Sequence, residues 1–78
     1  MPVRAYVLIE TMPGKSRDVV AQVRALAGVV AADRVTGPYD VVVVLETETL
    51  DQIGQTLTHH IHTISGVMRT VTCIVVPA

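Results

Sequence analysis

The stretch TGPYDVVVVLE, residues 36–46, places five consecutive large apolar residues, Val41–Leu45, directly after a Gly-Pro-Tyr-Asp turn. A strand with one buried face alternates apolar and polar side chains, because successive side chains point to opposite faces of the sheet. This run does not alternate, so both of its faces must be covered. A chain as short as 78 residues buries only about 60% of the surface that its unfolded form exposes. The second face therefore needs cover from outside the chain.

The sequence contains one pattern twice. The residues LIET at 8–11 return as VLET at 44–47, and LAGV at 26–29 returns as ISGV at 64–67. Each half has an apolar strand that ends in Glu-Thr, then a helix, a Gly-Val pair and a second strand. We therefore expect two strand-helix-strand units in succession.

The first helix is expected to begin near residues 13–16, where Pro and Gly stop the preceding strand. Either Gly14 or Ser16 is placed to cap its exposed N–H groups. Gly28 lies where a C-cap glycine is expected, and Arg24 in the last turn suits the helix dipole. The apolar stripe of this helix is predicted at Val19, Val23 and Leu26.

The second helix has clearer signals. Thr49 and Gln52 have the spacing of a capping box. Gly66 is expected to end the helix, and the last strand is expected from Val67 to Val76, where Pro77 stops it. The apolar stripe of this helix is predicted at Leu50, Ile53, Leu57, Ile61 and Ile64.

This element order predicts an α+β fold of the ferredoxin-like βαββαβ type. A four-stranded antiparallel sheet carries two helices on one face, and residues 1–78 form a single domain. The other face of the sheet is bare. A bare face that carries Val and Leu is typical of an interface. A second copy of the chain, sheet on sheet, covers it most economically, so a homodimer is expected.

The charge of the chain limits its partners. Six Lys and Arg stand against seven Asp and Glu, and there is no basic cluster, so neither direct nucleic-acid binding nor membrane attachment is expected. No apolar run approaches the roughly 20 residues of a membrane helix, and the N-terminus lacks the apolar core of a signal peptide. The single cysteine, Cys73, excludes an internal disulfide. A cytoplasmic location is expected.

Three short motifs carry a resemblance to a known family. VTGPYD at residues 35–40, SGVMRTVT at residues 65–72 and Pro13-Gly14 resemble, in this order and spacing, motifs of the ligand-binding domain of Lrp/AsnC transcription regulators. This domain is also called the RAM domain, and the similarity covers nearly all of the chain. The chain begins at the first strand of that domain, so it resembles a stand-alone version without the family's helix-turn-helix DNA-binding domain.

The resemblance implies a sheet-to-sheet dimer of the dimeric α+β barrel type, which commonly builds larger rings. It also implies the sensing of a small molecule, usually an amino acid held between subunits. Without a DNA-reading element, such a chain is expected to act through its own oligomer or through full-length Lrp/AsnC regulators of the same fold.

The candidate ligand-binding residues are Gly37, Tyr39, Asp40, Thr70 and Thr72. Gly37 lets a ligand approach the backbone, the N–H groups of the turn can receive a carboxylate, and Asp40 can attract an ammonium. The alternative for Asp40 is a purely structural turn residue, and for Tyr39 a packing residue. Thr70 and Thr72 share one face of their strand. Their hydroxyls either complete a zwitterion site or form a polar strand edge.

Other polar residues carry weaker signals. His59, His60 and His62 look like a metal site, but zinc needs three or four ligands, so an exposed helix end is expected and no metal or cofactor is predicted. Arg34 and Arg69 are either carboxylate partners or solvated surface residues. No catalytic constellation is present, so an enzyme is not expected. The alternatives are a small dimeric α+β barrel enzyme of the monooxygenase or isomerase type and an ACT-like amino-acid sensor.

Overall fold

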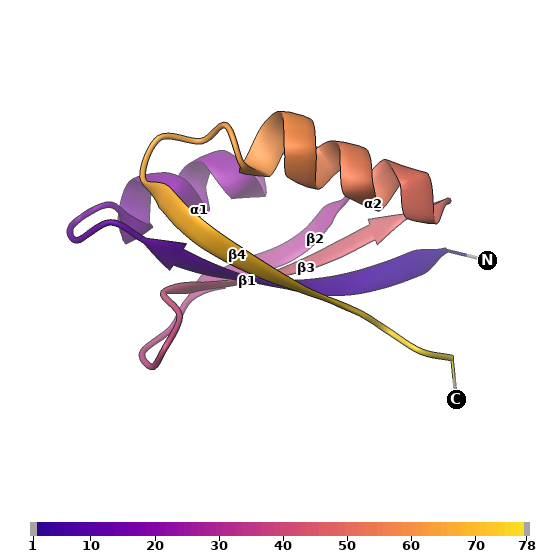
Figure 1. Cartoon of the computed structure of the whole chain (residues 1–78), viewed down its shortest axis with the longest axis horizontal. Coiled ribbons are helices and arrows are strands. Elements are labelled where there is room, and N and C mark those ends of the chain that lie inside the picture. Colours follow the sequence, from indigo (N-terminus) through magenta and orange to yellow (C-terminus); the bar gives the residue numbers. More distant parts are fainter. Residues whose placement is uncertain (1, 78) are drawn as a thin grey trace.

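The computed structural model describes residues 2–77. Four strands form one sheet, and both helical segments lie on the same side of it (Figure 1). The elements follow in the order β1 (Val3–Thr11), α1 (Ser16–Arg24), β2 (Val29–Arg34), β3 (Val41–Thr47), α2 (Leu50–Thr56), η1 (Leu57–Ile61) and β4 (Val67–Ile74). Within residues 2–77, no helix has the length and apolar character needed to cross a membrane.

The sheet has the strand order β2-β3-β1-β4, and every neighbouring pair is antiparallel. The first and third strands therefore lie in the centre, and β2 and β4 form the edges. This arrangement confirms the predicted α+β ferredoxin-like fold, with two helices over one face of a four-stranded antiparallel sheet.

The unbroken valine run serves two faces. Val41, Val43 and Leu45 are fully buried beneath the helices, while Val42 and Val44 are only partly buried on the other side of the sheet. Strand β1 alternates in the same way. Its buried side chains, with the helical ones that pack on them, form a single core: Ala5, Val7, Ile9, Val19, Val20, Val23, Ala32, Val41, Val43, Leu45, Ile53, Ile61 and Ile64.

The ends of α1 differ from the predicted caps. Lys15 is the N-cap, and its side chain has no acceptor with which to cap the helix. The hydroxyl of Ser16, a predicted cap, instead accepts from Nε of Arg34 at 3.2 Å. Ala25 is the C-cap, so the prediction of Gly28 as the C-cap glycine was wrong. Gly28 lies three residues later, in the turn into β2, where its φ of 89° is left-handed.

The capping box of α2 is confirmed. Oγ1 of Thr49 accepts from the N–H of Gln52 at 3.3 Å, and Oε1 of Gln52 accepts from the N–H of Thr49 at 3.1 Å. After Thr56 the α-helix continues as the π-helical turn η1, which the sequence pattern did not predict. The N–H of His62 closes this wider turn by donating to the carbonyl of Leu57 at 2.8 Å.

Two further predictions at the ends of elements were wrong. Leu50 is 59% exposed, although the helical stripe placed it in the core. It is the first residue of α2, and it lines a surface hollow together with Val3 and Ile74. Strand β4 ends at Ile74 rather than at residue 76, although the N–H of Val75 still donates to the carbonyl of Arg4 at 2.8 Å.

The alternation in β3 predicts opposite outcomes for one substitution at adjacent positions. Val43→Asp places an uncompensated charge in the core, which costs about 3–5 kcal/mol, a large part of the stability of so small a domain. Val42→Asp places the same charge on the face without helices and leaves the monomer fold intact. Circular dichroism during thermal unfolding should show a cooperative transition for Val42→Asp and none for Val43→Asp. Loss of the cooperative transition in both variants would contradict the assignment of Val42 and Val43 to opposite faces of the sheet.

Candidate functional site

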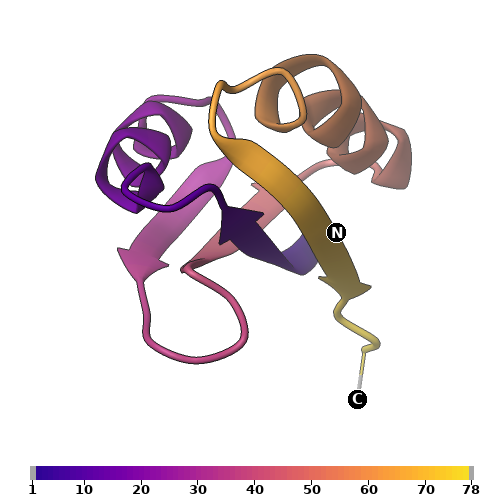
Figure 2. The same ribbon diagram turned by 60° about the vertical axis from the view of Figure 1, so that its left-hand side comes forward.

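The candidate ligand residues around Gly37 lie on an open loop of six residues, 35–40, between β2 and β3. In Figure 2 this loop extends away from the helices. The N–H of Val35 donates to the carbonyl of Asp40 at 2.9 Å and so closes the base of the loop. Gly37 has a φ of 143°, and a Cβ placed there would meet no atom within 4 Å. The backbone at Gly37 is therefore open to approach, and Tyr39 is half-buried beside it.

Asp40 connects this loop to the central strand. Its Oδ2 accepts from the N–H of Thr11 at 2.8 Å, and its own N–H donates to the carbonyl of Ile9 at 2.9 Å. The carboxylate meets β1 where the register with β4 shifts, between Glu10 and Thr11. This contact agrees with the structural alternative for Asp40. Within residues 2–77 its Oδ1 makes no hydrogen bond, so the second oxygen is still available to a ligand.

Thr70 and Thr72 lie on one face of β4, as predicted from their spacing. They pair with Ile9 and Val7, whose side chains are buried beneath the helices, so both hydroxyls face the helical side of this edge strand. Both side chains are half-buried. Oγ1 of Thr70 lies 2.9 Å from Nε2 of His62, which comes from the turn after η1.

Within one chain, the loop 35–40 and the threonines of β4 lie on opposite sides of β1 and share no pocket. Asp40 contacts Ile9 from the β3 side, and Thr70 pairs with Ile9 from the β4 side. Thr70 lines a hollow of about 280 Å³ with His62, Val67, Met68 and Arg69, and no residue of the loop 35–40 reaches it. Within residues 2–77 the loop 35–40 and the threonines of β4 therefore do not form one site, and a site between subunits stays a prediction.

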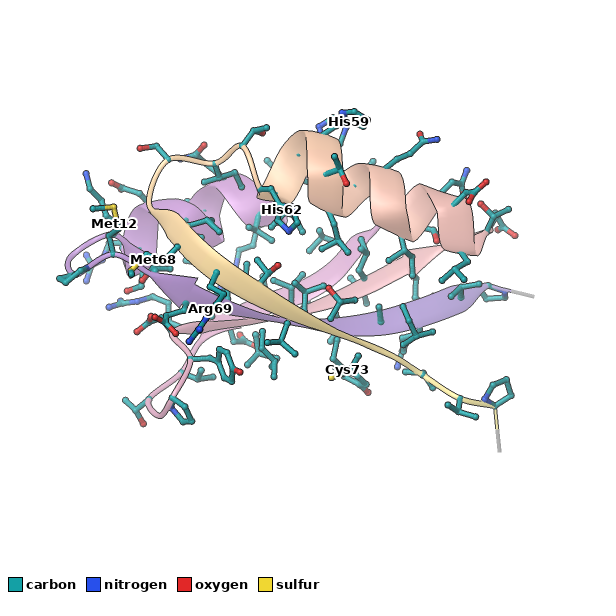
Figure 3. All side chains as sticks on the ribbon, viewed as in Figure 1. Met12, His59, His62, Met68, Arg69 and Cys73 are labelled. Carbon is teal, nitrogen blue, oxygen red and sulfur yellow. The ribbon has the colours of Figure 1, made fainter. Side chains whose placement is uncertain are left out.

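The candidate arginines have partners within the chain. Arg69 pairs with Glu10 at 3.0 Å, and Arg34 donates to Ser16. Figure 3 shows the side chain of Arg69 on the side of the sheet without helices, opposite to His62. Arg34 remains exposed beside an open hollow at the loop, lined by Ser16, Arg34, Val35 and Thr36.

The three histidines divide between two surroundings. His59 points outward from the helical layer, whereas His62 points toward β4 (Figure 3). Among residues 2–77, no three His, Cys, Asp or Glu side chains come together as a metal-binding group. The contact of His62 with Thr70 was missed, because a regular helical periodicity gives no signal for the extra residue of a π-turn.

The side of the sheet without helices, here called the open face, carries an apolar strip between two ion pairs. Arg4 pairs with Glu46 at one end, with Nε 2.7 Å from Oε2, and Glu10 pairs with Arg69 at the other. The hydrogen bond to Glu46, together with its charge, raises the pKa of Arg4. The strip consists of partly exposed side chains from the two central strands and β4: Tyr6, Leu8, Val42, Val44 and Val71.

The sequence and the fold agree on a family. The family model described as the Lrp/AsnC ligand binding domain matches residues 4–77. The chain belongs to this family. None of the curated proteins compared with the chain matches it. The match confirms the resemblance carried by the loop 35–40 and by the start of β4.

Solved structures extend this result. FFRP-DM1 is 35% identical and has a TM-score of 0.90, with 95% of this chain and 99% of that chain covered. E. coli AsnC is 23% identical and has a TM-score of 0.90; the match covers 97% of this chain and 52% of AsnC. The regulator NMB0573 of Neisseria meningitidis, solved as a complex with L-Met, is 16% identical with a TM-score of 0.85, and 96% of this chain covers 50% of it. The last two show a shared fold, and the chain spans about half of their length.

The contact of Asp40 with Thr11 predicts a cost in stability that does not depend on any ligand. Asp40→Ala leaves the N–H of the buried Thr11 without an acceptor and should cost about 1.5–3 kcal/mol. Asp40→Asn keeps an oxygen acceptor and should cost less. Asp33→Ala is the matched control, because the side chain of Asp33 is 75% exposed and its Oδ1 lies 3.8 Å from the guanidinium of Arg24. Urea unfolding measures all three, and an equal loss for Asp40→Ala and Asp33→Ala would contradict this role.

Proposed function

We propose that the chain is a small-molecule-binding regulatory module whose ligand is an amino acid and whose response is a change in assembly. Membership of the Lrp/AsnC ligand-binding family carries this proposal. The L-Met complex of the similarly folded regulator NMB0573 supports the choice of an amino acid. On this proposal the chain acts by binding and catalyses no reaction.

The first component of the proposal is self-association through the open face. The apolar strip defined above has no cover within residues 2–77, and such strips mark interfaces. A second copy, sheet against sheet, buries the strip in both subunits. The ion pairs Arg4–Glu46 and Glu10–Arg69 then lie at the rim, where charged groups set orientation more than affinity. Rings of dimers, or mixed assemblies with regulators of the same fold, extend this arrangement.

The second component is a ligand site shared between subunits. Free N–H groups near Gly37 receive the ligand carboxylate, and Oδ1 of Asp40 accepts from its ammonium. Tyr39 packs against the ligand from the same loop. Thr70 and Thr72 of a neighbouring subunit supply hydroxyls, and His62 holds the Thr70 hydroxyl in place. The hydrogen bond from the N–H of Thr11 to Oδ2 of Asp40 supports this role for Oδ1, because it fixes the orientation of the carboxylate.

The open face also favours binding over catalysis. Its central side chains are aliphatic apart from Tyr6, and the exposed Cys73 lies beside it at the edge strand. A dimeric α+β barrel enzyme needs a polar pocket on this face. An ACT-like sensor shares the fold and would differ chiefly in how its subunits pair.

Association through the open face predicts that Val42→Asp yields a folded monomer while the unmodified chain is a dimer or a larger ring at micromolar concentration. The charge would be buried against the partner's apolar strip without a counter-charge. Ala21→Asp is the control, because it adds the same charge on the exposed surface of α1 and should keep the oligomer. Light scattering measures the mass. A monomeric unmodified chain would contradict the proposed assembly.

The ligand site predicts a response to amino acids. A thermal-shift screen of the twenty amino acids should reveal at least one that raises the melting temperature, because a ligand bound only to the native state stabilises it. Calorimetry with that amino acid should show roughly ten-fold weaker binding or more for Asp40→Asn and for the pair Thr70→Val, Thr72→Val. Thr58→Val, at an exposed position of η1, should bind normally. The proposed site is wrong if all variants bind equally.

A further inference from the structure

Another hollow lies at the opposite end of β2 from the loop 35–40. Its volume is about 300 Å³. It is lined by the turn after α1, the end of β3 and one side of the α2 and η1 segment, and its lining residues include none of the candidate ligand residues named above. The residues that line it are Ala27, Gly28, Glu46, Thr47, Gln52, Gln55, Thr56 and His60.

The helical wall of this hollow offers hydrogen-bonding side chains that have no partner within residues 2–77. Oε1 of Gln52 is occupied, because it accepts from the N–H groups of Glu48 and Thr49, so its amide nitrogen remains as a donor. The side chains of Gln55, Thr56 and His60 make no hydrogen bond within residues 2–77. An amide, a hydroxyl and an imidazole therefore meet at one hollow with no protein partner.

The opposite wall adds two backbone donors. The N–H groups of Ala27 and Gly28 have no acceptor within the described residues, while their neighbours Leu26 and Val29 donate within the turn. Successive free N–H groups at a turn that enters the left-handed region form a concavity that binds anions. The φ of Gly28 is 89°, and a Cβ there would lie 3.0 Å from the carbonyl oxygen of Glu46, so a glycine is required at this point.

The eight residues that line the hollow include neither Lys nor Arg, and they place no free carboxylate beside an anion. Glu46 is the one acidic residue among the eight that line it. The side chain of Leu45 is buried beneath the helices, so the side chain of the next residue, Glu46, points to the open face. There its carboxylate is bonded to Arg4. The hollow thus combines two free backbone donors with side chains that can donate or accept, and it holds no uncompensated carboxylate. A ligand that matches the two backbone donors must supply acceptors, and a carboxylate supplies the strongest ones.

We propose that this hollow is a second small-molecule site, independent of the loop 35–40, which takes a small organic carboxylate with a further hydrogen-bonding group. The carboxylate oxygens accept from the N–H groups of Ala27 and Gly28. The remainder of the ligand bonds to Gln55, Thr56 and His60 across the hollow. Hydroxy acids and small amino acids have this combination of groups.

Amide NMR spectra of the ¹⁵N-labelled full chain test this proposal with acetate, lactate and acetamide at constant ionic strength. Acetate and lactate should shift the Ala27 and Gly28 resonances to saturation, and lactate should bind more tightly because its hydroxyl adds a contact. Acetamide has the same shape as acetate without the charge, and should leave these resonances in place. Resonances that do not move, or that move equally with acetamide, would overturn the proposal.

Two matched variants locate the site. His60→Leu should weaken lactate binding by about five-fold, the effect of one lost hydrogen bond. His59→Leu changes a neighbouring histidine that does not line the hollow and should have no effect. Asp40→Asn should leave the Ala27 and Gly28 shifts unchanged, which separates this site from the one at the loop. Equal weakening by His59→Leu and His60→Leu would overturn the assignment.

Discussion

Two helices cover one face of a four-stranded sheet and leave the other bare, and the remaining features of the molecule follow from this one-sided burial. Because side chains alternate along a strand, core residues and surface residues alternate in β1 and β3 at single-residue intervals. Val43 supports the fold, and Val42 beside it has no cover. A slip of one residue in the register would exchange the two sets, so the same pattern that holds the core also fixes the composition of the open face.

The carboxylate of Asp40 joins the loop 35–40 to this framework. Its bond to the N–H of Thr11 occurs at the irregularity in β1, where the register with β4 shifts so that Thr11 lies opposite Val67. The loop is thus tied to the central strand rather than to β2 and β3 alone. On the proposed function, a ligand at the loop would engage a carboxylate that also supports the sheet, so Asp40 would serve both stability and the proposed binding.

The sequence was sufficient for the order of the elements, the ferredoxin-like plan, the capping box at Thr49 and the family. These features depend on local spacing and on hydrophobic period. The caps of α1 were not predictable, because the hydroxyl of Ser16 is taken by Arg34 from a distant strand. The contact of His62 with Thr70 was missed because helical periodicity gives no signal for the π-turn η1, which precedes His62. The hollow beside Gly28 was missed because the turn at Gly28 approaches residues of β3 and the α2 and η1 segment that are remote in sequence.

The strand order has a consequence for synthesis on the ribosome. Strand β1 lies in the middle of the sheet, yet both of its partners, β3 and β4, come later in the chain, and Ala5 pairs with Leu45 and Ile74. The first of these four strands to be translated must therefore wait until β4 has been made before its pairing is complete. Its apolar residues stay without native partners during elongation, and contacts of such long sequence separation slow the formation of the native sheet. Nascent copies on one messenger RNA consequently expose the same unpaired strand close to one another.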